Sequence, residues 1–306
     1  FHGTFLSSIM KYQINGRIHG EINQLRGDNG GTVSGRLSMS NPNLQQVPAR
    51  NKDFGPKIRS LFIPEESFKW GSFDYSQQEP RMTVHYAASI GDGYEGSNEL
   101  VEAYQNASAD FHQTVADLVG IERTQAKTIG LGLMYGMGKN KLANSLGVTK
   151  DEANELIIKY NKKVPFVKKL SDRCKYAADE KGVIRTKKGR KCRFDMWETR
   201  DFGLHVAEKY EDAVAKYGKD NIKRAYTYKA LNKLIQGSSA DQTKQSMLDC
   251  YNAGHLPMLQ IHDELCFNIK DESHAKEIQK IMQSSIEFKV PSVVEFGLGK
   301  SWGDAK

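Results

Sequence analysis

Residues 69–81 read KWGSFDYSQQEPR, an apolar, strand-like run that breaks at Asp74. A second run, QIHDELCFNI at 260–269, breaks in the same way at Asp263. A carboxylate at the end of a buried strand is costly unless a cation or hydrogen bonds satisfy it. One such aspartate is more often a turn or cap residue. Two of them in one basic chain predict a shared divalent-metal centre that acts on phosphates.

A helix rich in cations and glycine is predicted between these two runs. Residues 123–136 read RTQAKTIGLGLMYG, which spaces four side chains at intervals of four on one helix face: Arg123, Lys127, Leu131 and Tyr135. Cations on so apolar a helix are better placed in a cleft than on a solvated face, and both can contact phosphate oxygens. The glycines match neither a P-loop nor a dinucleotide fingerprint. They predict close approach of a base pair or a backbone instead.

Composition favours a polyanionic partner. The 306 residues carry a net charge of +7. A predicted hairpin at 183–194 concentrates six cations without an acid: Arg185, Lys187, Lys188, Arg190, Lys191 and Arg193. This cluster predicts contact with a phosphate backbone, and a solvated hairpin tip is the alternative.

Other sequence features bound the class of protein. The four cysteines form no C-x-x-C pair, which favours reduced thiols in a cytosolic setting over zinc. No apolar run is long enough to predict a membrane span, and no signal peptide is apparent at the start. Because the chain begins at Phe1, we expect a fragment or a processed product.

The order of predicted elements favours an α+β fold. Strands are expected at 58–63 and 69–75, helices from about 81 to 181, a helix over 204–217, and a long helix over 227–252. A strand pair over 256–269, a helix at 273–287 and a strand at 293–298 follow. This order predicts an antiparallel sheet domain interrupted by a helical insertion.

Five ordered motifs resemble the polymerase region of family-A DNA polymerases, the group of bacterial DNA polymerase I and its phage relatives. They are TVSGRLSMSNPNLQQVPAR (32–50), FDYSQQEPR (73–81), RTQAKTIGLGLMYG (123–136), LIQGSSAD (234–241) and IHDEL (261–265). The closing segment VEFGLGKSW (294–302) is similar to the family's last strand. The resemblance runs from about Thr32 to Lys306.

The resemblance implies a role for individual residues. Asp74 and Asp263, with the Tyr75 carbonyl, would ligate two Mg²⁺ ions, and Glu264 would lie beside them near the primer end. Arg123, Lys127 and His112 would bind the triphosphate, with Lys127 a candidate general acid. Glu79 and Tyr135 would form a steric gate against a ribose 2′-hydroxyl, flanked by Gln78 and Leu131. The residues assigned to primer–template DNA are Arg36, Asn232, Gln236 and His262, together with Lys187, Lys188, Arg190 and Lys191 of the hairpin.

The implied protein is a template-directed DNA polymerase that uses dNTPs. Its sheet domain, the palm, would take residues 1–85 and 183–306, its helical fingers would take 86–182, and an insertion is expected near 198–222. A bacterial or phage-infected cytoplasm is the expected setting, and the identity of any processivity factor stays open. The family usually has Phe or Tyr where this chain has Leu131, so we expect weak use of dideoxynucleotides.

Two alternatives stay open at this point. One is a single-subunit RNA polymerase relative, against which Glu79 argues because a gate glutamate blocks ribonucleotides. The other is a DNA-binding remnant without catalysis, against which the retained Asp74, Lys127 and Asp263 argue.

Overall fold

The computed structural model describes residues 3, 7–25, 27, 31–48, 51, 53–105, 110–201, 203 and 206–305. The chain divides into two compact units. Unit 1 comprises residues 1–78 and 239–306, and unit 2 comprises residues 79–238. Two helices, α3 (Gln78–Ala88) and α11 (Ala230–Asn252), contain the points where the chain passes from one unit to the other.

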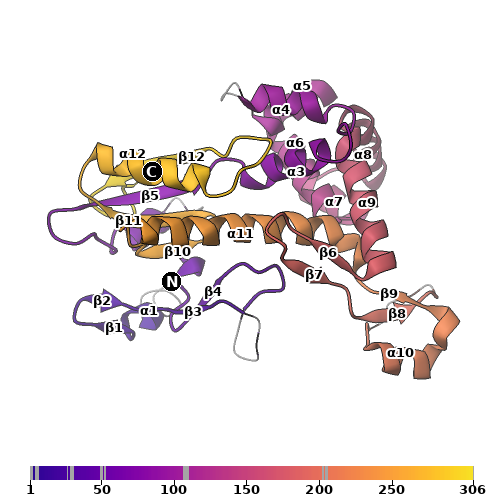
Figure 1. Cartoon of the computed structure of the whole chain (residues 1–306), viewed down its shortest axis with the longest axis horizontal. Coiled ribbons are helices and arrows are strands. Elements are labelled where there is room, and N and C mark those ends of the chain that lie inside the picture. The colour runs from indigo at the N-terminus through magenta and orange to yellow at the C-terminus, as the bar shows by residue number, and fades with distance from the viewer. Residues whose placement is uncertain are drawn as a thin grey trace. The chain divides into compact units, whose positions relative to one another are not determined.

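Unit 1 is built on a four-stranded antiparallel sheet in the order β10-β11-β5-β12. The strands are β10 (Leu259–Ile261), β11 (Glu264–Ile269), β5 (Lys69–Tyr75) and β12 (Val294–Gly299), and α12 (Glu272–Ser284) packs against them (Figure 1). The N-terminal part adds α1 (Ser8–Met10), β1 (Gln13–Ile14), β2 (Arg17–Ile18), β3 (Glu21–Asn23), β4 (Ser38–Ser40), η2 (Leu44–Gln46) and α2 (Gly55–Arg59).

Side chains along β5 alternate between the two faces of the sheet. Phe73 and Tyr75 join a buried cluster with Leu265, Phe267 and Val294, which α11 and α12 cover through Cys250, Ala275, Ile278 and Met282. Gly71 lies on the same face. A Cβ atom at this position would meet Ile269 Cγ1 at 2.4 Å, which explains why the residue is glycine. Successive side chains point to opposite faces, so Asp74 lies on the face away from these helices.

Unit 2 begins with a series of helices and continues with two small hairpins. The helices are α4 (Ser97–Gln105), α5 (Phe111–Val119), α6 (Arg123–Met134), α7 (Lys139–Leu146), α8 (Lys150–Lys163) and α9 (Pro165–Lys181). The hairpins pair β6 (Val183–Arg185) with β7 (Lys191–Arg193), and β8 (Trp197–Thr199) with β9 (Ile222–Arg224). Helix α10 (Tyr210–Tyr217) and η3 (Lys219–Asn221) connect β8 to β9, and η4 (Thr227–Lys229) leads into α11.

The α+β class is confirmed, and most predicted elements are present. The strand predicted over 58–63 is wrong: residues 55–59 form α2, which begins with Pro56 in its first turn, where a missing N–H costs nothing. The helix predicted over 204–217 begins only at Tyr210. Residues 204 and 205 of the predicted helix lie outside the described part of the chain. The same is true of residues 49 and 50 in the 32–50 motif. All four cysteines are buried and free.

The contact-based units do not coincide with the palm and fingers ranges expected from the sequence. Residues 183–238 fall into unit 2, together with the helices. The assignment of ranges to palm and fingers stays a prediction. Among the described helices, none combines the length and the apolar character needed to cross a membrane.

Candidate active site

Acidic side chains gather at one end of the unit 1 sheet. The strand register places Glu264 of β11 and Glu295 of β12 directly opposite Asp74, one on each side. Asp263 precedes Glu264 in the turn between β10 and β11. Like charges directly opposite one another in a sheet are destabilising. The strands thus place three carboxyl groups side by side at this end of the sheet.

The electrostatics of Asp74 and Asp263 reflect this crowding. Loss of hydration, followed by repulsion from Asp263, Glu264 and Glu295, raises the pKa of Asp74 to about 7, although part of its side chain still meets solvent. Loss of hydration also raises the pKa of Asp263, while Arg36 and His262 oppose that change. A bound cation would stabilise both ionised carboxylates.

The turn that presents Asp263 is held by a buried network. His262 adopts a left-handed conformation with φ of 56°, which is uncommon for a residue other than glycine. The buried Gln260 donates from Nε2 to the His262 carbonyl at 2.6 Å, and Gln45 Nε2 donates to Gln260 Oε1 at 3.0 Å. Gln260 and Gln45 thus stabilise a strained backbone next to Asp263.

Glu264 and Tyr75 are oriented by other partners. Ser72 donates a hydrogen bond to Glu264 Oε1, and Trp302 Nε1 donates to the same oxygen at 3.1 Å. The Tyr75 hydroxyl donates to the Met282 carbonyl at 2.6 Å, on the side of the sheet covered by helices. The Tyr75 hydroxyl is therefore engaged away from Asp74.

The residues present fit a magnesium centre. Within the described part of the chain, no three His, Cys, Asp or Glu side chains converge into a complete metal site. Mg²⁺ does not require one, because it usually takes one or two carboxylates and completes its coordination with waters and substrate phosphates. Asp74 and Asp263, hard oxygen donors that repel each other, are suited to that role.

A substitution at Asp74 should reveal the repulsion in the metal-free protein. We expect Asp74→Asn to raise the midpoint of thermal unfolding in EDTA at pH 8. Because the folded-state pKa of about 7 lies above the ordinary value of 3.8, folding takes up a proton between these pH values. The free energy of unfolding of the native chain should therefore fall as pH rises from about 4 to about 7.

The stability test compares thermal unfolding at pH 5 and pH 8, with and without Mg²⁺. The native chain should gain stability from Mg²⁺, since a ligand of the folded state shifts unfolding by mass action, and the variant should gain much less. Asp53→Asn, at an exposed carboxylate of the same unit, is the control. An Asp74→Asn variant that unfolds at a lower temperature than the native chain at both pH values would contradict the charge-repulsion account.

Unit 2 carries a second group of site residues on α5 and α6. Arg123 binds Asp110 Oδ2 through Nε at 2.8 Å and Nη2 at 2.6 Å. Asp110 also caps α5 by accepting from the backbone N–H of His112 and of Gln113. Sequence reasoning assigned no role to Asp110. Asp110 holds the Arg123 guanidinium at the start of α6. A phosphate group could take the place of Asp110 as the partner of Arg123.

Lys127 and His112 lie close to this pair. Burial and the cations Lys127 and Arg123 lower the pKa of His112 to about 4, against the opposing effect of Asp110. His112 is thus neutral near pH 7, and its buried Nδ1 has no hydrogen-bond partner among the described residues. Lys127 is exposed and has no acidic partner in the described part of the chain. Lys127 can therefore donate a hydrogen bond to a ligand, and His112 Nδ1 can donate or accept one.

The predicted gate pair is joined in the structure. The Tyr135 hydroxyl, at the C-terminal end of α6, donates to Oε2 of the buried Glu79 in the first turn of α3. Leu131 is half-buried one turn before Tyr135. Gln78 is buried in unit 1, where its amide nitrogen donates to Gln242 Oε1 at 3.0 Å.

The prediction for the α6 glycines is wrong at two positions. A Cβ on Gly130 would meet the Tyr160 hydroxyl at 3.2 Å, and one on Gly132 would meet Met137 Sδ at 3.2 Å. Both glycines are buried and serve packing inside unit 2. The exposed face of the helix is left to Arg123, Lys127 and Tyr135.

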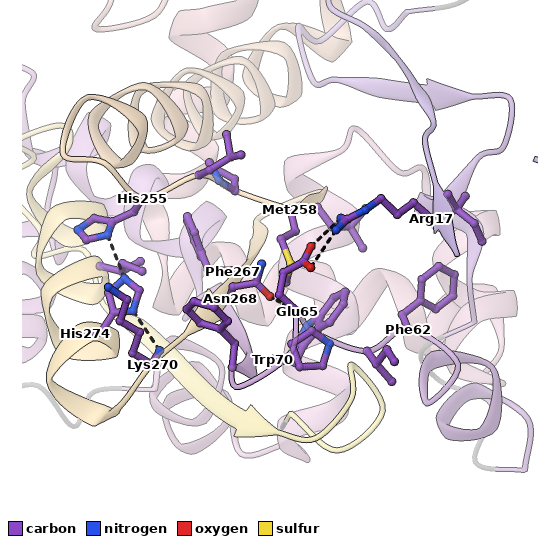
Figure 2. A pocket seen from close by; sticks show the side chains of 18 of the residues that line it. Arg17, Phe62, Glu65, Trp70, His255, Met258, Phe267, Asn268, Lys270 and His274 are labelled. Carbon is purple, nitrogen blue, oxygen red and sulfur yellow. Dashed lines mark hydrogen bonds and ion pairs between the residues drawn. The ribbon is translucent and has the colours of Figure 1, made fainter. Parts of the chain in front are cut away.

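The residues predicted to contact DNA are distributed over both units. In unit 2, Asn232 and Gln236 are half-buried at a spacing of four on α11, and no described residue binds their side-chain amides. In unit 1, the charge of Arg36 lowers the pKa of Asp263 against the effect of burial. The side chain of His262 is exposed. A separate cavity of about 1040 Å³ in unit 1, lined by Arg17, Glu65, Trp70, His255 and His274 among others, contains none of the predicted site residues (Figure 2).

The basic hairpin is formed as predicted. Lys187, Lys188 and Lys191 are exposed around the turn at Gly189, and the Lys187 backbone N–H donates to the Tyr86 hydroxyl at 3.0 Å. The Tyr86 hydroxyl also bonds to Ser238 of α11 at 2.7 Å. The cations thus lie on an anchored hairpin.

Neutralising the hairpin should weaken DNA binding for every sequence alike. We expect replacement of Lys187, Lys188, Arg190 and Lys191 by glutamine to make the slope of log K against log salt shallower by roughly 0.9 for each duplex phosphate that is no longer neutralised. Binding titrations over a range of salt measure this slope. Lys168→Gln, at a lysine paired with Asp172 on α9, is the control. An unchanged slope would assign the hairpin to solvated surface.

Comparison with known proteins agrees with this geometry. A family model described as DNA polymerase family A matches residues 2–304. A DNA-directed DNA polymerase of Pseudomonas phage M6 is 38% identical over 98% of this chain and 49% of its own length. The DNA polymerase DpoZ of Vibrio phage phiVC8 is 30% identical over 99% of this chain and 48% of its own length.

A solved structure shares the fold. The POL domain of Pol1 from M. smegmatis, in complex with DNA primer-template and dNTP, superposes with a TM-score of 0.77 at 26% identity. The match covers 98% of this chain and 51% of that one. The chain therefore spans about half the length of these two phage relatives and of the solved chain. Together, the family match, the relatives and the shared fold show that the chain belongs to DNA polymerase family A.

Proposed function

We propose that this chain is a template-directed DNA polymerase that adds deoxynucleotides to a primer 3′ end. The observation that carries the proposal is the end of the unit 1 sheet. There, two aspartates 189 positions apart in sequence lie close enough to repel each other, and Arg36 and His262 favour the ionised form of Asp263. Family membership and the DNA and dNTP bound to the M. smegmatis relative support the same substrates.

Each group of residues has a part in the proposed reaction. Asp74, Asp263 and the Tyr75 carbonyl would hold two Mg²⁺ ions, and Glu264, fixed by Ser72 and Trp302, would lie near the primer end. Bound there, such ions lower the pKa of the attacking 3′-hydroxyl and neutralise charge on the leaving pyrophosphate.

The unit 2 residues would bind and select the nucleotide. Arg123 would exchange Asp110 for phosphate oxygens, and Lys127 would contact the same phosphates and donate a proton to the pyrophosphate. Neutral His112 would donate or accept one further hydrogen bond. Glu79 and Tyr135 would exclude a ribose 2′-hydroxyl. Asn232 and Gln236 would contact the minor groove near the new pair, where acceptor positions are similar for all base pairs.

A single assay separates this proposal from its alternatives. A primed template is supplied with Mg²⁺ and either dNTPs or rNTPs, and the products are resolved by length. We expect extension with dNTPs and little with rNTPs. Preference for rNTPs would favour an RNA polymerase relative. Binding of the primed template without extension by either substrate would favour a non-catalytic DNA-binding remnant.

A further inference from the structure

Asp110 bonds to two helices of unit 2 with the two oxygens of one carboxylate. As the N-cap of α5, it accepts at Oδ1 from the backbone N–H groups of His112 at 2.9 Å and Gln113 at 3.1 Å. Its other oxygen, Oδ2, accepts two bonds from the Arg123 guanidinium at the first residue of α6. The carboxylate thus has a capping task and a pairing task, each on its own oxygen.

Only the pairing task needs the negative charge. Asn and Asp are about equally good N-cap residues, because either side-chain oxygen accepts from the first backbone N–H groups of a helix. A neutral amide gives up the charge-assisted bonds that a carboxylate forms with a guanidinium. Burial acts to raise the pKa of Asp110, but hydrogen bonds from Arg123 and from the start of α5 hold it below its ordinary value. The carboxylate is therefore ionised near pH 7.

The ion pair between Asp110 and Arg123 is open to solvent. The Arg123 side chain is 46% exposed and the Asp110 side chain is 29% exposed. Ion pairs at such exposure contribute little net free energy, since water and salt screen both charges. An anion that reaches Arg123 can therefore displace the carboxylate at low cost, whereas a fully buried pair would resist displacement.

Two neighbouring groups suit an anion with several phosphates. Lys127 is exposed one helical turn after Arg123 and has no acidic partner in the described part of the chain. His112 is buried near both cations, and its Nδ1 has no hydrogen-bond partner among the described residues. A polyphosphate can bond to all three groups at once. Its contacts with Lys127 and His112 offset the loss of the pair between Asp110 and Arg123.

We propose that Asp110 is an internal competitor for the phosphate site on α6: it occupies Arg123 until a polyphosphate displaces it, and it returns when pyrophosphate leaves. The inference rests on the proposed function, because it takes Arg123, Lys127 and His112 as the triphosphate site. Competition weakens every phosphate ligand of Arg123 according to the fraction of molecules in which Arg123 is free. Asp110 thus sets the affinity for the nucleotide and favours release of the product.

Binding of dATP and of inorganic pyrophosphate without DNA tests this competition. Titration calorimetry in Mg²⁺ compares the native chain with Asp110→Asn, which keeps the cap and removes the charge. We expect the variant to bind both ligands about three- to tenfold more tightly, because neither has to displace an ion pair or meet its negative charge. Asp110→Ser, with a second residue that caps helices well, should show the same gain.

Matched variants separate competition from a structural role. Asp117→Asn removes one charge from the same helix, at an exposed residue that accepts a bond from Gln113 at 2.7 Å, and should bind both ligands as the native chain does. In an Arg123→Ala background, Asp110→Asn should lose most of its effect, because the partner for which it competes is gone. The thermal unfolding midpoint of Asp110→Asn should stay close to native, since the cap of α5 is kept.

Three results would overturn the inference. The first is binding of dATP and pyrophosphate by Asp110→Asn and Asp110→Ser that is no tighter than native. The second is an equal gain in Asp117→Asn, which would indicate a general effect of charge. The third is a gain that persists in full without the Arg123 guanidinium.

The same titrations separate this inference from the proposed function. A native chain that binds neither ligand, with Arg123→Ala no different, would refute the phosphate site on α6 itself. Native binding that Arg123→Ala weakens, combined with no gain in Asp110→Asn, would refute only the competition. In primer extension, Asp110→Asn should be inhibited by pyrophosphate at concentrations about three- to tenfold lower than the native chain, in line with the tighter binding. Equal inhibition of the two would contradict the role in product release.

Discussion

Alanine at Asp74 or at Asp263 is expected to reduce the rate of primer extension by about a thousandfold or more. Metal-ion catalysis of phosphoryl transfer contributes several kcal/mol, and each 1.36 kcal/mol is a factor of ten in rate. The neighbouring carboxylate of Glu264 is already bound by Ser72 and Trp302. Single-turnover incorporation of one nucleotide measures the loss.

The loss should lie in the chemical step. Both variants should bind primer–template DNA about as well as the native chain, since removing a carboxylate reduces repulsion of phosphates. Asp212→Ala, at an exposed position in the first turn of α10, should keep the native rate. Near-native single-turnover rates in either Asp74→Ala or Asp263→Ala would refute the metal-centre assignment.

Glu79→Ala is expected to raise the efficiency of ribonucleotide incorporation about 10- to 100-fold, with a much smaller effect on deoxynucleotides. The buried Glu79 carboxylate and the Tyr135 hydroxyl are hydrogen-bonded to each other. A ribose 2′-hydroxyl placed against them would clash or leave a buried polar group unpaired, a penalty of roughly 1–3 kcal/mol in proteins. Alanine removes the obstructing side chain and with it the penalty.

The ratio of rNTP to dNTP incorporation efficiency measures this effect. Glu79→Gln keeps the side-chain volume and a group that can bond to Tyr135, so it should keep most of the discrimination. If the alanine variant discriminates against ribonucleotides as strongly as the native chain, Glu79 is not the gate.

Local patterns in the sequence were sufficient for most elements of the fold. The apolar run at residues 69–75 predicted β5, and the spacing of residues 123–135 predicted α6. The strand predicted at 58–63 was wrong because short apolar runs occur in both strands and helices, and composition does not separate the two. Strand order in the unit 1 sheet depends on pairing between residues far apart in the chain, which no local pattern specifies.

The candidate site was predicted only in part, for a similar reason. Side chains that carry the chemistry stood out because charges interrupt apolar runs at Asp74, Asp263 and Lys127. The residues that orient them are ordinary in sequence: Asp110 reads as a helix cap, Trp302 as a core residue and Gln260 as a strand residue. Their roles arise from tertiary hydrogen bonds to Arg123, Glu264 and the His262 carbonyl.

The central claim is that this chain copies a template by metal-dependent nucleotide addition. The most direct test offers the native chain four primed templates that differ only in the first unpaired base, each with one dNTP at a time, in Mg²⁺ or in EDTA. We predict that the primer grows by one nucleotide only with the complementary dNTP and only in Mg²⁺. Addition that ignores the template base, or no addition under any of these conditions, would contradict the claim.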